Sequence, residues 1–230
     1  MSKLIARRKF LTGAAAMTLL AGCEGHPTRI VNRLVGRWNE SFEELMFSPT
    51  RLAPEMPASA LTAEKDFPFF YHGPSVPAVP PNWTLKIGGL VKHPMVLTLD
   101  QLKAMPATAM RVTHYCVDGW TAVASWHGVR VSEIARIAIL DPRVKYVEFR
   151  SFDNGYYAGW DIASALHPQT LLAYGMNGHE VSAGHGAPLR VYTAIKLGYM
   201  SVKYLTEVNF LPYKVMGTYA DNGFDWFAGV

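Results

Sequence analysis

Cysteine is nearly absent from this chain of 230 residues, which contains only Cys23 and Cys116. Two cysteines cannot build a disulfide-rich scaffold, and the chain has no Cys-x-x-Cys-His sequence that would attach a haem covalently. Internal repeats and low-complexity runs are also missing. These absences, together with the length, predict one globular domain with a sizeable core behind an N-terminal extension.

Acidic residues are missing from the first 23 positions, whose order of features is typical of a twin-arginine export signal. Residues 7–9 are Arg-Arg-Lys, residues 11–20 are weakly apolar, and residues 20–23 spell a lipobox, Leu-Ala-Gly-Cys. The apolar stretch is too short for a membrane-spanning helix, which needs about 20 apolar residues. We therefore expect a periplasmic protein that is anchored to a membrane by lipid on Cys23, with Cys116 as its one free thiol.

An excess of positive charge is also missing once the signal is set aside. The chain has 22 Lys and Arg against 18 Asp and Glu, and four of the basic residues lie within residues 1–23, which leaves 18 of each sign. Nucleic-acid binding depends on clustered Lys and Arg, so we expect no nucleic-acid partner. The twin-arginine route carries folded proteins, which commonly have acquired a redox cofactor first, and it therefore favours a redox function.

The organisation of the chain can be read from its apolar spacing and its prolines. Residues 28–47 repeat apolar side chains at helical spacing and predict an amphipathic helix that covers one side of the catalytic domain. The proline-rich residues 48–81 predict an extended segment that wraps over a surface. The predicted domains are thus the signal at 1–23, the helix and extended segment at 24–81, and a catalytic domain at 82–230.

Strand patterns dominate the catalytic domain. A capping box at residues 98–101 and sequences near Ser132 and Asp161 predict short helices, and Asn177-Gly178 predicts a hairpin turn. Because strands do not alternate with long helices, the predicted fold is α+β, a strand-rich mixed domain. The predicted strands cover residues 83–90, 110–115, 145–149, 156–160, 171–176, 189–192 and 202–210.

Four sequence blocks resemble the sulfite oxidase family of molybdopterin enzymes. They are His-Tyr-Cys-Val at 114–117, Leu-Leu-Ala-Tyr-Gly-Met-Asn-Gly at 171–178, His-Gly-Ala-Pro-Leu-Arg at 185–190 and Gly-Tyr-Met-Ser-Val-Lys at 198–203. Each block alone is modest evidence, but the four occur in the family's order around a single cysteine. The resemblance extends over roughly residues 67–230 and implies the molybdopterin-binding fold of that family.

The resemblance implies that Cys116 gives a thiolate to molybdenum, whose other sulfur ligands come from one molybdopterin. Soft sulfur donors suit such a metal, and coordination keeps the cysteine deprotonated. Arg190 would bind the molybdopterin phosphate, because a guanidinium is a planar donor matched to oxyanions. The other residues that the resemblance assigns to the cofactor are His72, Ser151, His185, Gly198, Tyr199, Met200 and Lys203.

The implied reaction is two-electron chemistry at molybdenum with transfer of an oxygen atom. Asp118, beside the thiolate, is the candidate for proton transfer when a sulfoxide-type oxygen leaves as water. Tyr219 is the candidate active-site tyrosine. Taken alone, Asp118 is equally consistent with a solvated loop carboxylate, and Tyr219 with simple packing.

The segment after Cys116 separates this chain from the sulfite oxidases. Those enzymes have an arginine-containing segment there, which holds the sulfite anion, whereas residues 117–121 are Val-Asp-Gly-Trp-Thr. The layout is more similar to exported single-domain reductases, among them the catalytic subunits of protein-methionine-sulfoxide reductases. We therefore expect reduction of a small or protein-bound S-oxide or N-oxide, with sulfite oxidation as the alternative.

The resemblance also bears on partners. The sequence has no counterpart of the family's C-terminal dimerisation domain, so we expect a monomer. It carries no haem, flavin or iron–sulfur motif, so electrons must come from a separate membrane or periplasmic carrier, a haem or cytochrome protein.

Two hypotheses from other classes remain at this stage. An exported cysteine near His114 and His127 could be the nucleophile of a cell-wall transpeptidase, in which histidine activates sulfur. A lipid-anchored binding module without catalysis is the other. Neither explains the blocks around His185 and Arg190, and metal analysis discriminates among the three.

Overall fold

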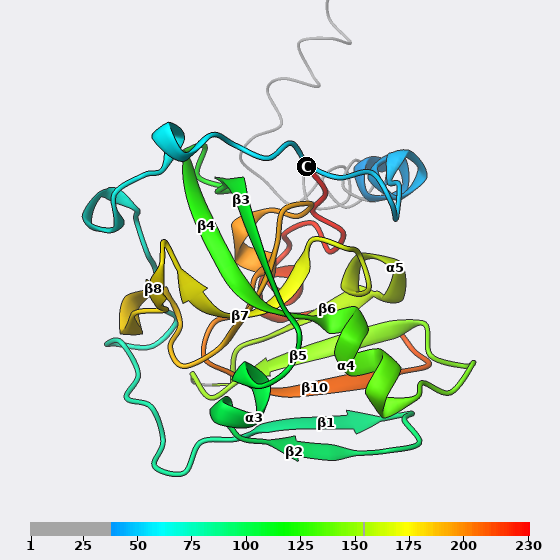
Figure 1. Ribbon diagram of the computed structural model, residues 1–230. Helices are drawn as coiled ribbons and strands as arrows, with labels where there is room; N and C mark the ends of the chain where they lie inside the picture. The colour runs from blue at the N-terminus through cyan, green and yellow to red at the C-terminus, as the bar shows by residue number, and fades with distance from the viewer. Residues whose placement is uncertain (1–37, 154) are drawn as a thin grey trace, which may run out of the picture. The chain divides into compact units, whose positions relative to one another are not determined.

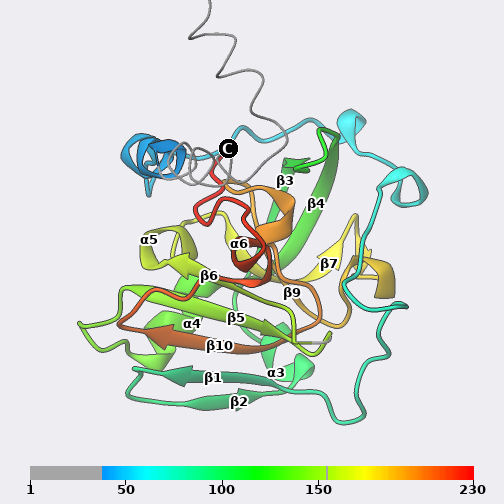
Figure 2. The same ribbon diagram turned by 180° about the vertical axis from the view of Figure 1, so that it is seen from behind.

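Two β-sheets organise the part of the chain that the computed structural model describes, residues 38–153 and 155–230. Both views show the first sheet below the second (Figures 1 and 2). Only β1 and β10 pair in parallel among the described strands; the other pairs are antiparallel. The first sheet has the order β2 (Met95–Leu97), β1 (Leu85–Gly89), β10 (Leu205–Leu211), β5 (Tyr146–Ser151), β6 (Tyr157–Asp161). The second has the order β3 (Ala107–Tyr115), β4 (Thr121–Arg130), β7 (Thr170–Met176), β8 (His179–Glu180), with β9 (Arg190–Thr193) also on β7.

Strand β7 lies between two hydrophobic cores, and this explains its unbroken apolar sequence. All seven of its residues are buried. Because successive side chains of a strand point to opposite faces, Leu172 and Tyr174 join the first core, whereas Leu171 and Ala173 join the second. Met176, the last residue of the strand, departs from this alternation and also packs in the second core. The same alternation applies to β9, and it sends the side chains that end at the candidate site to the face of the second core.

Short helices connect the strands. Helix α3 (Leu99–Lys103) begins at the predicted capping box, in which Thr98 and Gln101 bond to each other's backbone amides. Helix α4 (Val131–Ala138) buries Val131, Ile134, Ala135 and Ala138, which share one helical face. The remaining short helices are α5 (Ile162–Ala165), α6 (Thr218–Asp221), η1 (Ala58–Ala60), η2 (Glu64–Asp66), η3 (Ala183–His185) and η4 (Gly198–Met200). The strand-rich α+β class is confirmed.

Residues 51–73, which we call the strap, run outside the second sheet and then to the candidate site. Met56 and Arg111 of β3 exchange two hydrogen bonds, and Thr62 and Val123 of β4 exchange two more. Figure 1 shows this cyan segment passing the end of the β3–β4 hairpin and continuing past β8. Two backbone–backbone bonds and two side chain–backbone bonds to the sheet thus hold this proline-rich segment in place.

Several strand boundaries differ from the sequence-based expectation. The ten-residue β4 and the short β2 and β8 were not predicted. Strand β10 begins at Leu205 rather than at residue 202, because Tyr204 has a φ of 55°, which is incompatible with a strand. The hairpin turn at Asn177-Gly178 is confirmed, with positive φ at both residues.

The N-terminal calls fall mostly outside the described residues. Residues 38–46 are helical, whereas residues 28–37 of the predicted helix, and the predicted signal with Cys23, lie outside the described part. Contacts divide the chain into two units, Met1–Leu45 and Met46–Val230. Among the described residues, no helix combines the length and the apolarity needed to cross a bilayer.

Candidate functional site

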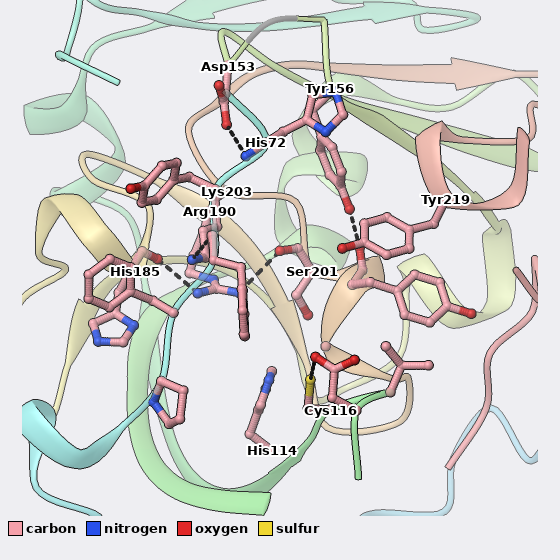
Figure 3. A pocket seen from close by; sticks show the side chains of 18 of the residues that line it. His72, His114, Cys116, Asp153, Tyr156, His185, Arg190, Ser201, Lys203 and Tyr219 are labelled. Carbon is pink, nitrogen blue, oxygen red and sulfur yellow. Dashed lines mark hydrogen bonds between the residues drawn. The ribbon is translucent and has the colours of Figure 1, made fainter. Parts of the chain in front are cut away.

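A cavity of about 360 Å³ opens where the strap, the β3–β4 hairpin, β9, η4 and α6 meet (Figure 3). Its walls combine titratable side chains with aromatic rings. Residues of the strap that line it are Phe67, Pro68, Phe69, Phe70, Tyr71 and His72. The others are His114, Cys116, Val117, Asp118, Trp120, Ser151, Asp153, Tyr156, His185, Arg190, Gly198, Tyr199, Ser201, Lys203, Tyr204, Tyr219 and Phe224.

Cys116 occupies the first position of the loop that joins β3 to β4. Its backbone amide donates to the carbonyl of Trp120 and its carbonyl accepts from the amide of Gly119, each at 3.0 Å. Gly119 has a φ of 88°, which favours glycine at this position. The tight turn fixes Cys116 at the end of the hairpin, with its sulfur toward the cavity.

The Cys116 thiol has an acidic neighbour. Its Sγ lies 3.6 Å from Oδ2 of Asp118. Burial, and secondarily the Asp118 carboxylate, raise the pKa of the thiol against the opposing effect of backbone amides. A raised pKa makes a poor thiolate nucleophile in the free protein, whereas a bound metal would hold the sulfur deprotonated.

Arg190, the first residue of β9, forms the buried cationic end of the cavity. It is 3% exposed, and its Nη1 and Nη2 donate to the carbonyls of His185 (2.8 Å) and Ser201 (3.1 Å). Its guanidinium lies 4.8 Å from the ring of Trp126 and 5.6 Å from that of Tyr192. Burial lowers the pKa of Arg190 to about 10, so the side chain remains charged at neutral pH.

Three further basic groups lie at the same end. Burial, followed by the charge of Arg190, lowers the pKa of Lys203 to about 7 and that of His185 to about 4. The pKa of His114 falls to about 3, through burial and then through Arg190, Lys203 and His185. At neutral pH, Arg190 therefore carries its charge, Lys203 is partly charged and the two imidazoles are neutral, while the carboxylates of Asp153 and Glu64 oppose the shifts at Lys203 and His185.

Several buried polar atoms in the same walls are unpaired. Within the described residues, Nε of Arg190, Oγ of Ser201 and Oη of Tyr204 are buried without a hydrogen-bond partner. Buried polar atoms are normally paired, since each unmade bond costs about 1 to 3 kcal/mol. Three unpaired atoms beside a cationic cluster fit an anionic group such as a phosphate.

The opposite end of the cavity is aromatic. The rings of Tyr219 and Tyr199 stack with centroids 4.8 Å apart, and Phe224 meets Tyr219 edge-on at 4.9 Å. Tyr156 donates from its hydroxyl to the carbonyl of Tyr199 at 2.5 Å. Burial and then the nearby Asp118 and Cys116 raise the pKa of Tyr219. Tyr219 therefore lies near the thiol.

His72 and Ser151 line the cavity, and both are hydrogen-bonded to Asp153. Asp153 is 6% exposed. Its carboxylate accepts a hydrogen bond from the backbone amide of His72 at 3.1 Å, and its backbone amide donates to Oγ of Ser151 at 2.8 Å. The His72 ring lies 5.8 Å from that of Tyr156. These bonds connect the end of the strap to the loop between β5 and β6.

The structure brings nearly all of the residues named from the sequence to this one cavity. Met200 is the exception, because its side chain packs in the first core and only its neighbours Gly198 and Tyr199 line the cavity. Sequence reasoning missed Ser201 although it lies inside the fourth sequence block, and named His114 only as a possible activator of the thiol. It gave no signal for Asp153, Tyr156 or Tyr204.

The geometry around Cys116 does not suit a histidine-activated nucleophile. The described hydrogen bond of the sulfur goes to Asp118 rather than to an imidazole, and the ring of His127 lies instead against Tyr174 at 5.2 Å. No group of three His, Cys, Asp or Glu among the described residues could hold a metal by itself. A metal at Cys116 would take its other ligands from a group that is not protein.

Known proteins give a consistent comparison. The family described as "Oxidoreductase molybdopterin binding domain" matches residues 72–219. A protein of Azospira oryzae with the provisional name protein-methionine-sulfoxide reductase subunit YedZ1 is 33% identical over 99% of this chain and 89% of its own length. The protein-methionine-sulfoxide reductase catalytic subunit MsrP of Xanthomonas axonopodis is 35% identical over 56% of this chain, which spans 45% of that relative.

A solved structure shares the fold. The sulfane dehydrogenase SoxCD of Paracoccus pantotrophus superposes with a TM-score of 0.56 over 58% of this chain and 39% of its own, at 22% identity. This similarity supports the strand-rich molybdopterin-binding fold of the sulfite oxidase family.

Proposed function

The chain belongs to the family of oxidoreductase molybdopterin-binding domains, and from this premise we propose that it reduces S-oxides, with methionine sulfoxide in polypeptides as the preferred substrate. It is an enzyme of that family rather than a cysteine transpeptidase or a binding module. The observation that carries the proposal is the separation of charge within the cavity. Arg190, Lys203 and His185 gather at one end, whereas Cys116 has Asp118 and Tyr219 for neighbours. The names of two relatives support the same substrate.

Each end of the cavity fits one part of a molybdenum–molybdopterin cofactor. Arg190, Ser201, Tyr204 and Lys203 would hold its phosphate, because they offer positive charge and unpaired polar atoms. The sulfur of Cys116 would bind the metal, since soft donors suit it. When bound, this group supplies two-electron chemistry with oxygen-atom transfer, and the protein supplies its orientation.

The residues beside Cys116 would protonate the oxygen that leaves the substrate and shape the site around it. Reduction of a sulfoxide to a thioether consumes two protons and two electrons and releases water. Asp118, exposed to solvent and 3.6 Å from the sulfur, would deliver protons. The stacked rings of Tyr219 and Tyr199 offer an apolar wall to the methyl group of the substrate. Electrons would come from a separate haem-containing carrier protein.

A screen of the cofactor-loaded enzyme tests the proposal. With a reduced artificial donor, methionine sulfoxide and other S-oxides should be turned over faster than sulfite is oxidised. Sulfite near Cys116 would lack a charge-assisted partner of a kind that contributes about 1.5 to 3 kcal/mol, roughly tenfold or more in affinity. Efficient sulfite oxidation without reduction of any oxide would return the chain to the alternative function.

Export and anchoring are a second part of the proposal. The pattern of residues 1–23 supports twin-arginine export and lipidation of Cys23. Multiple acyl chains give stable membrane attachment, so Cys23→Ser should release the enzyme or block its maturation. Labelled palmitate that fails to enter the wild-type protein would disprove lipidation.

A further inference from the structure

Residues 67–73, which we call the strap end, form one wall of the cavity without belonging to a helix or a strand. Every residue from Phe67 to His72 lines the cavity. Within residues 38–153 and 155–230, residues 68–73 make no backbone–backbone hydrogen bond. The amide of His72 donates instead to the carboxylate of Asp153 (Figure 3). The described contacts that hold this wall are thus made through side chains.

Two of these side chains lie at the end of the cavity that fits a phosphate. Nζ of Lys203 donates to the carbonyl of Phe70 at 2.6 Å and to that of Gly184 at 2.8 Å. The ring of His185 meets that of Phe69 edge-on, with centroids 5.5 Å apart. Groups of the proposed phosphate site therefore also hold the strap end.

Lys203 can serve the strap end and a phosphate at the same time. A lysine ammonium has three donors, and two of them go to the carbonyls of Phe70 and Gly184. Burial and then the charge of Arg190 lower the pKa of Lys203 to about 7, so the amine of the free protein is only partly charged. An anion on the third donor would favour the charged form and thereby strengthen both bonds to carbonyls.

We propose that the cofactor phosphate and the strap end stabilise each other through Lys203. The inference rests on the proposed placement of the phosphate, and it holds whichever oxide the enzyme reduces. Coupling of this kind is reciprocal. If the bound cofactor slows the opening of the strap end, then a change that loosens the strap end must weaken the binding of the cofactor.

Hydrogen–deuterium exchange, measured by mass spectrometry on cofactor-loaded and cofactor-free protein, tests the first half of this coupling. Peptides that cover the strap end should exchange about fivefold or more slowly in the loaded protein, which is the lower end of the usual coupling between sites. Peptides that cover β2, which does not line the cavity, should exchange equally in both and serve as the internal control.

Gly184→Ala tests the second half, with Gly88→Ala as its matched control. A Cβ at Gly184 would lie 2.9 Å from the ring of Phe69, so alanine should displace that ring while its own carbonyl still accepts from Lys203. A Cβ at Gly88, in β1, would lie 3.1 Å from a side-chain oxygen of Asn209, and neither glycine lines the cavity. Gly184→Ala should speed exchange of the strap end and weaken molybdopterin retention during dialysis, each by about fivefold, and Gly88→Ala should do neither.

Three results would overturn the coupling. The first is equal exchange of the strap end in loaded and cofactor-free wild type while β9 and η4 are protected. The second is faster exchange of the strap end in Gly184→Ala with cofactor retention unchanged. The third is loss of cofactor in Gly184→Ala without faster exchange of the strap end, because the alanine would then act through the neighbouring His185.

Other results separate this inference from the proposals on which it builds. Equal exchange of β9, η4 and the strap end in loaded and cofactor-free protein would overturn the placement of the phosphate, and the coupling with it. Protection of the strap end in a loaded protein that reduces no oxide supports the coupling, and that absence of turnover would instead overturn the reductase function.

Discussion

At the scale of single residues, the cavity is defined by groups whose protonation the fold disfavours. Burial lowers the pKa of Lys203, His185 and Arg190, and the charge of Arg190 lowers the first two further. A bound anion would relieve this repulsion. The free protein therefore retains an unfavourable charge cluster, which is common at functional sites.

Lys203 should make the stability of the cofactor-free protein depend on pH. Its pKa is about 7 in the folded protein against an ordinary value of 10.5, so unfolding above pH 7 takes up a proton. Burial of the charged ammonium therefore destabilises the folded protein at low pH, and this cost is relieved as pH rises above 7 and the amine becomes neutral. We predict that the free energy of unfolding, measured in urea, gains from this group between pH 7 and 9 and that Lys203→Met removes the gain.

The exposed Lys92 provides the control, since Lys92→Met should keep the dependence on pH. Cofactor binding should weaken the pH dependence of the wild type, because a bound anion favours the charged ammonium of Lys203. Identical pH profiles for the wild type and Lys203→Met would contradict the buried charge cluster.

At the scale of elements, β4 shows why part of the fold could not be predicted. The strand spans Thr121–Arg130 but contains Ala, Ser and Gly, which have low strand propensity, and its register shifts between His127 and Gly128. Neither feature gives the regular alternation that identifies a strand in sequence. By contrast, β7 and the capping box of α3 depend on local patterns and were predicted.

Gly128 is a position at which β4 lies too close to β7 for a side chain. A Cβ there would collide with the carbonyl of Leu172. Gly128→Ala should therefore destabilise the protein by about 1 to 3 kcal/mol, the usual effect of overpacking, and should disturb the hairpin that carries Cys116. Urea unfolding measures the first effect and cofactor content the second.

Thr108→Ala, opposite Gly128 in the β3–β4 ladder, is the control and should change stability much less. Equal stability of Gly128→Ala and the wild type would mean that the two strands can separate at the bulge at little energetic cost.

At the scale of the whole molecule, the cavity joins segments from Phe67 to Phe224. The sequence blocks identified residues of the site because each block is a short contiguous motif that can be recognised without knowing the fold. They could not reveal the separation of a cationic end from an aromatic end, which depends on nonlocal pairing of β9 with β7 and of the strap with β3 and β4. Asp153 and Tyr204 were missed for the same reason.

Elemental and pterin analysis of the purified protein tests the central claim most directly. Protein made in a host that synthesises the cofactor should contain about one molybdenum and one molybdopterin per chain, because Cys116 is the one cysteine thiol within the described residues. Arg190→Met should lower both contents, Arg130→Met, at an exposed arginine, should lower neither, and Cys116→Ser should fold but lack turnover. Folded wild-type protein without molybdenum would contradict the account.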